Sequence, residues 1–204
     1  MRSSDAGASR FHVGVAGWGL SRAVADRFPA EGTHLQRYAA VLPAVEINSC
    51  FYRHHRPETY AKWAASVPAG FRFSVKLPRA ITHEASLEAW EPVLGRFLGE
   101  VSLLGEKLGC VLVQLPPKLA FDLQVAEVFF TALRAKYTGP LACEPRHQTW
   151  ASDAAESLLR EHGIARGADA WCILDNTASG AAVANAIELL DACHSSPGRP
   201  SSSS

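Results

Sequence analysis

Long apolar runs are absent from this chain of 204 residues. None approaches the roughly 18 apolar residues of a membrane-spanning helix, so we expect no membrane partner. Residues 1–10 lack the apolar stretch of a secretory signal and are expected to form a flexible N-terminus. An excess of either charge is also missing, because Lys+Arg and Asp+Glu number 20 each. Net charge therefore gives no support for a nucleic-acid partner, although it says nothing about a local basic groove.

Paired cysteine motifs are missing too. The five cysteines are odd in number, none has CxxC spacing, and most lie inside apolar runs. This pattern predicts reduced core residues in a reducing, cytoplasmic compartment. Residues 194–204 (HSSPGRPSSSS) are of low complexity and are expected to be disordered. One globular domain over residues 11–193 remains.

The common catalytic and nucleotide-binding motifs are absent as well. The chain has no P-loop, no GxSxG and no HExxH, and its Cys and His residues lack zinc-type spacing. The glycines in GWG (17–19) do not form GxGxxG, so dinucleotide binding is not supported. The sequence therefore identifies neither a cofactor nor a metal.

Short strand-like runs alternate with helix-like runs, and nothing suggests a hairpin. This order predicts an α/β fold with a parallel sheet. A doubly wound sheet and a barrel both fit it. The strands are expected at residues 11–17, 44–48, 71–76, 110–115, 140–144, 163–166 and 171–175.

The last two of these strands are too close in sequence. Only four residues, Gly167–Ala170, separate them, whereas a parallel crossover needs about a dozen or more. Either residues 163–166 are not a strand, or a segment is absent at this point.

Polar residues stand at the carboxyl ends of several predicted strands. Ligands bind at this edge in barrels and in open α/β sheets, so the pattern predicts a site there. The alternative is that these residues form structural ion pairs, such as Lys76 with Glu46 or Glu144. The polar residues at these ends are Glu46, Asn48, Lys76, Gln114, Glu144, Asp175 and Asn176.

The segment EPRHQTW (144–150) carries the most chemistry. A carboxylate with an imidazole suits acid–base catalysis, so Glu144 and His147, together with Glu46, are the catalytic candidates. Arg146 is suited to holding an anion, and Trp150 to stacking on a ring. Alternatively, His147 is an ordinary loop residue and Trp150 packs against the barrel rim. The ligand-binding candidates are Asn48, Tyr52, Lys76, Gln114, Arg146, Trp150 and Asn176.

Several motifs together resemble the YecE-like family, also called domain of unknown function 72. They are GVAGW, VEINSCFY, PETYAKWA, FRFSVKLPRAITH, LGCVLVQLPP, CEPRHQTW and WCILDNTASGAAVANAIEL, in the order typical of that family. The resemblance implies a TIM-like β/α barrel but no particular reaction. It assigns family-motif positions to all the candidates above and to Phe51 and Pro116.

The chain also departs from the family pattern. Pro145 and Gln148 replace a Phe and a Pro of the family's fifth motif. A further strand and helix, with a motif resembling YxRxHG, are expected before the stretch WCILDNT, yet Arg166 leads straight into residues 167–171. The resemblance therefore implies an incomplete barrel that lacks about one and a half β/α units before the last strand.

Three interpretations of function follow. The chain is an enzyme that processes a phosphate-bearing polar ligand, such as a sugar phosphate or a nucleic-acid end, at the carboxyl edge of the strands. Alternatively, it is a non-catalytic binding module for such a ligand, or an inactive truncated fragment. An open edge of the sheet would also favour self-association.

Overall fold

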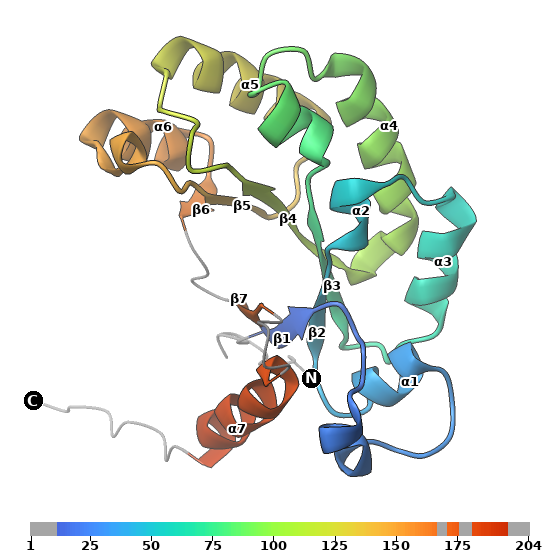
Figure 1. The fold of residues 1–204 in the computed structure, drawn as a ribbon. Coiled ribbons are helices and arrows are strands. Elements are labelled where there is room, and N and C mark those ends of the chain that lie inside the picture. The colour runs from blue at the N-terminus through green and yellow to red at the C-terminus, as the bar shows by residue number, and fades with distance from the viewer. Residues whose placement is uncertain (1–11, 167–170, 176–180, 196–204) are drawn as a thin grey trace, which may run out of the picture.

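A computed structural model describes residues 12–166, 171–175 and 181–195. Its seven strands form one curled sheet of parallel neighbours in the order β6-β5-β4-β3-β2-β1-β7 (Figure 1). The strands are β1 (His12–Ala16), β2 (Ala44–Ile47), β3 (Arg72–Lys76), β4 (Leu108–Gln114), β5 (Leu141–Glu144), β6 (Ile164–Arg166) and β7 (Trp171–Leu174).

Helices follow the strands and cover the outer, convex side of the sheet, as α3, α4, α5 and α6 show in Figure 1. None of the helices in the described part of the chain is long and apolar enough to span a bilayer. The α-helices are α1 (His34–Ala39), α2 (Ser49–Tyr52), α3 (Pro57–Ala65), α4 (Glu91–Val101), α5 (Leu123–Lys136), α6 (Asp153–Glu161) and α7 (Ala182–Ser195). Short 3-10 helices cover Arg22–Arg27, Ser102–Lys107 and Gln148–Ala151, and a π-helix covers Ala80–Glu84.

Local sequence explains where several helices begin. Thr33 and Gln36 form a capping box at the start of α1, and Asp122 accepts a hydrogen bond from the backbone N–H of Val125 at the start of α5. Pro57 occupies the first turn of α3, where its missing N–H costs nothing. Local capping residues and a proline thus determine where these helices begin, independently of tertiary packing.

The two faces of the sheet differ in side-chain size. Outward-facing residues such as Val45, Phe73 and Val111 are fully buried against the helices. The concave face instead carries small side chains, among them Ala16, Ser74, Cys110, Ala142 and Ala165. Bulky branched residues usually fill the interior of a β/α barrel, so small ones leave space inside the curl.

The sheet does not close in the described part of the chain. β7 pairs with β1, and β6 pairs with β5, but β6 and β7 do not pair with each other. The predicted α/β class, the parallel sheet and the incomplete barrel are confirmed, and residues 164–166 are a strand. The four residues between β6 and β7 lie outside the described residues, as do residues 1–10 and 196–204.

Candidate functional site

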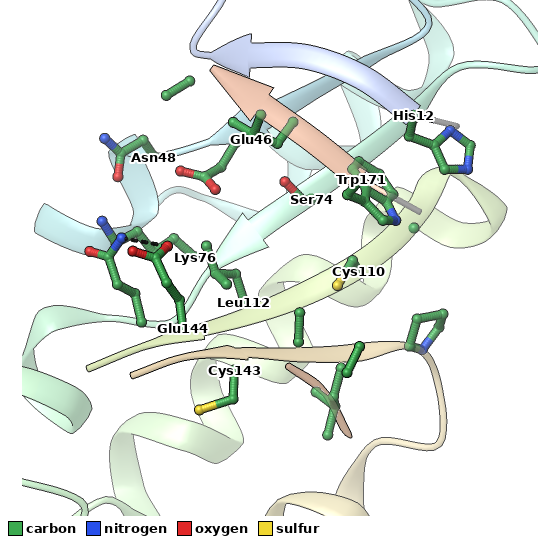
Figure 2. Close-up of a pocket in the computed structure, with 18 of the residues that line it drawn as sticks. His12, Glu46, Asn48, Ser74, Lys76, Cys110, Leu112, Cys143, Glu144 and Trp171 are labelled. Atoms are coloured by element: carbon green, nitrogen blue, oxygen red, sulfur yellow. Dashed lines mark hydrogen bonds between the residues drawn. The ribbon is translucent and has the colours of Figure 1, made fainter. Parts of the chain in front are cut away.

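A cavity of about 580 Å³ lies inside the curl of the sheet and is lined by residues from all seven strands. Figure 2 shows Glu46, Lys76, Glu144 and Trp171 pointing into it. A volume of this size is typical of a small-molecule site, for which the usual range is about 300–1,000 Å³. The charged and amide side chains that line it are Glu46, Asn48, Lys76, Gln114, Glu144, Arg146 and Asp175.

Strand alternation and register bring these groups together. Residues two apart on one strand share a face, so Ser74 and Lys76 both face the cavity. Across strands, Glu46 lies beside Ser74, and Gln114 lies beside Glu144. Each pair is held by backbone hydrogen bonds, so a scaffold of parallel strands positions the polar side chains.

Glu46 and Lys76 are opposite charges buried in the cavity wall, with only 6% and 8% of their surfaces exposed. Burial raises the pKa of Glu46 to about 7; Lys76 opposes this rise, while Glu144 and Asp175 add to it. Burial also lowers the pKa of Lys76, an effect that Glu46 opposes. A carboxyl group with a pKa near neutrality can give or take a proton at physiological pH.

The carboxylate of Glu144 is fixed by two neighbours. Gln114 Nε2 donates a hydrogen bond to its Oε2 over 3.0 Å, and Arg146 Nε pairs with its Oε1 over 3.0 Å. The ion pair uses Nε and leaves the two NH2 groups of the guanidinium outside the contact. Glu144 thereby orients Arg146 at the opening of the cavity.

Two buried polar atoms in the cavity wall have no hydrogen-bond partner within the described part of the chain. They are Asn48 Oδ1 and Ser74 Oγ. An unsatisfied buried polar atom costs about 1–3 kcal/mol, so such atoms indicate a water or ligand partner. Ser74 is 4% exposed, which places its hydroxyl well inside the protein.

Cationic side chains gather near His83, beside the buried Lys76. Lys76 Nζ lies 4.4 Å from the centroid of the Phe51 ring, and His83 packs edge-on against the same ring. Burial lowers the pKa of His83, and Lys76, Arg79, Arg146 and Lys118 lower it further. These four cations therefore act on one region of the molecule. Within the described residues, no group of three or more His, Cys, Asp or Glu is arranged to hold a metal.

Three predicted site residues do not line the cavity. Tyr52 is 70% exposed on α2. His147 Nδ1 accepts a hydrogen bond from the backbone N–H of Thr149 and so caps a short 3-10 helix. Trp150 is buried against Phe121 and donates a hydrogen bond to the Leu119 carbonyl. For His147 and Trp150, these positions agree with the alternatives to ligand binding, namely an ordinary loop residue and a packed indole. Asn176 lies outside the described residues.

Sequence reasoning missed Ser74, Trp171 and His12 as cavity residues. Ser74 could have been found, because it stands two residues before Lys76 on a strand of strict alternation. Trp171 and His12 lie at the amino ends of their strands, where the pattern of polar strand ends predicts no site.

These observations define a class of protein: an open β/α barrel with a ligand-sized, partly charged cavity inside its sheet. Residues 12–168 match the family described as "Protein of unknown function DUF72". The chain belongs to this family, as the motifs in the sequence predicted.

Curated relatives bear family designations without an activity. The chain is 27% identical to the UPF0759 protein YecE of Escherichia coli (strain K12) over 169 residues, or 82% of this chain and 61% of that protein. It is 28% identical to the UPF0759 protein YunF of Bacillus subtilis (strain 168) over 149 residues, which are 69% of this chain and 52% of that protein. The chain thus spans less than two thirds of the length of these relatives.

Solved structures of the family share the fold. A DUF72 family protein of Thermotoga maritima MSB8 matches with a TM-score of 0.63 at 26% identity, over 77% of this chain and 64% of that one. A DUF72 family protein of Enterococcus faecalis V583 matches with a TM-score of 0.61 at 22% identity, over 76% of this chain and 59% of that one.

Proposed function

We propose that this chain binds a small, phosphate-bearing polar ligand in the cavity of its open barrel. The observation that carries the proposal is the buried Lys76, which faces a ligand-sized cavity with Arg146 at the same opening. A desolvated ammonium and a bidentate guanidinium together suit a phosphate group. Arg79 and Lys118 add positive potential nearby.

Glu46 gives this site a capacity for acid–base chemistry. Its buried carboxyl group has a pKa of about 7 and lies in the same cavity as the salt bridge between Glu144 and Arg146. Two carboxyl groups with different environments can divide the roles of acid and base. In the enzymatic form of the proposal, Glu46 moves the proton and Glu144 keeps Arg146 in place. Without a reaction at Glu46, the same site is a binding module.

We further propose that the chain has lost a segment between β6 and β7. Only four residues separate β6 from β7, and the two strands do not pair with each other in the described part of the chain. The cavity walls from β1 to β5 retain their polar side chains, so we expect binding to survive the loss.

Titration with glucose 6-phosphate, followed by NMR and calorimetry, tests the binding. We expect Lys76→Met and Arg146→Gln each to weaken binding about tenfold or more, because each removes a charged hydrogen-bond donor. Glucose, which lacks the phosphate, is expected to bind far more weakly.

Matched surface variants separate a local effect from a general one. Arg160→Gln removes an arginine that is also paired with a glutamate, Glu156, but on the surface of α6. Lys62→Met removes an exposed lysine of α3. Both should bind like the wild-type chain. Unchanged affinity in the Lys76 and Arg146 variants would overturn the proposed site.

A further inference from the structure

The cavity has two chemically different ends. Figure 2 shows Glu46, Lys76 and Glu144 gathered at one end, and Trp171 and His12 at the other. Trp171 and Asp175 both line the cavity from the last strand region; four residues of strand span about 13 Å. The polar end is therefore separated from an aromatic end by the length of a two-part ligand.

The aromatic end is shaped by a glycine. A Cβ added at Gly109 would lie 2.4 Å from Cζ2 of the Trp171 ring, so only glycine lets the indole lie against β4. The indole also packs on His12, with 4.6 Å between ring centroids. Ile173, two residues further along β7, provides an adjacent apolar wall. Such a surface suits a flat, uncharged ring.

Ser74 stands between the two ends. It precedes Lys76 by two residues on β3, which places it about 7 Å deeper along the strand. Its Oγ is buried and has no hydrogen-bond partner within the described residues. A ligand that fills the cavity thus meets a hydroxyl group halfway along its length.

We propose that the ligand belongs to the class of nucleoside monophosphates: a planar base against Trp171, a hydroxyl-bearing sugar beside Ser74 and the phosphate at Lys76 and Arg146. This inference rests on the proposed function and extends it, because it specifies what is attached to the phosphate. A sugar phosphate alone would leave the aromatic end of the cavity unfilled.

Uridine 5′-monophosphate and ribose 5-phosphate test the inference, since the second carries a hydroxyl group at C1 in place of the base. We expect uridine 5′-monophosphate to bind about tenfold more tightly or better, as stacking on an aromatic side chain provides. Equal affinity would overturn the inference and leave the phosphate site intact. Binding of neither compound would overturn the proposed function as well.

Variants then locate the base. Trp171→Leu and Gly109→Ala, the second of which displaces the indole, should both abolish the preference for uridine 5′-monophosphate and leave the affinity for ribose 5-phosphate unchanged. Ser74→Ala should weaken both ligands about three- to tenfold by the loss of one hydrogen bond. Tyr52→Leu removes an exposed aromatic ring outside the cavity and should change nothing.

Binding of ribose 5-phosphate also reports whether each variant has folded, because it needs only the other end of the cavity. A preference for uridine 5′-monophosphate that persists in both Trp171→Leu and Gly109→Ala would place the base elsewhere and overturn the inference.

Discussion

At the scale of single residues, Glu46 is a carboxyl group held where its charge is poorly solvated. Its pKa rises from 4.5 to about 7 on folding, chiefly through burial. The folded state therefore holds the proton more tightly than the unfolded state. Below pH 4.5 the carboxyl group is protonated in both states, and its raised pKa does not affect the free energy of unfolding. As the pH rises from 4.5 to about 7, the unfolded state loses the proton first, so the folded state becomes less stable relative to it.

This predicts a pH-dependent effect of Glu46→Gln. At pH 8 the variant should be more stable than the wild-type chain by up to roughly 3 kcal/mol, because an uncharged amide replaces a buried carboxylate. Near pH 4 the two should be equally stable. Urea unfolding at both pH values measures the difference, with the exposed Glu31→Gln as the control. A gain in stability that is the same at both pH values would contradict the conclusion that burial raises the pKa of Glu46.

Most of the cavity's charged and amide residues could be predicted from sequence because they follow a strand pattern. Glu46, Lys76, Gln114 and Glu144 each stand at a strand end, and parallel strands bring such ends to one edge. Trp150 could not be placed the same way. An indole next to charged residues looks the same in sequence whether it faces a ligand or, as here, packs on Phe121.

At the scale of elements, a tyrosine hydroxyl joins β1 to β2. Tyr38 of α1 accepts a hydrogen bond from the Val15 N–H over 3.0 Å and donates one to the Ala44 carbonyl over 2.8 Å. Burial raises the pKa of Tyr38 above its usual range, so the hydroxyl stays protonated and can donate. Gly14 lies beside this junction: an added Cβ would lie 2.2 Å from the Ala44 carbonyl oxygen.

Gly14→Ala should therefore destabilise the chain by at least about 2 kcal/mol, as overpacking of a rigid backbone contact does. Gly95→Ala is the matched control, since nothing lies within 4 Å of a Cβ added there in α4. Alanine in a helix interior should stabilise by about 0.5–1 kcal/mol. Thermal and urea unfolding measure both changes, and equal effects of the two substitutions would contradict the Gly14 contact.

The π-helix after β3 was not predicted from sequence. Its residues, AITHE, carry no signal that separates a π-helix from an α-helix, and the turn is followed by Ser86 and Leu87 with positive φ angles of 53° and 69°. Leu87 is 2% exposed. Its left-handed backbone is kept by tertiary packing, which a local pattern does not contain.

At the scale of the whole molecule, the outer edges of β6 and β7 have no strand partner among the described residues, and they are the most exposed part of the sheet backbone. Strand edges expose N–H and C=O groups that can pair with another chain. If a helix has been lost as proposed, each 100 Å² of apolar surface that it would have covered costs about 2.5 kcal/mol, against a total domain stability of about 5–15 kcal/mol.

We therefore expect the chain to self-associate and to melt at a lower temperature than the longer Escherichia coli YecE protein. Light scattering across a dilution series, together with thermal unfolding of both proteins, measures this. A monomer at every concentration, with cooperative melting at a temperature comparable to that of YecE, would contradict the proposal that a segment is missing.

The strand order also has a consequence during synthesis of the chain on the ribosome. β1 to β6 are neighbours in the sheet in the order in which they are made, so each can dock on its predecessor as it emerges. β7 alone docks out of sequence, where Trp171 pairs with His12 at the start of the sheet. The outer edge of β1 thus stays uncovered until β7 (residues 171–174) has been translated, and we expect a chaperone that acts on nascent chains to bind this edge.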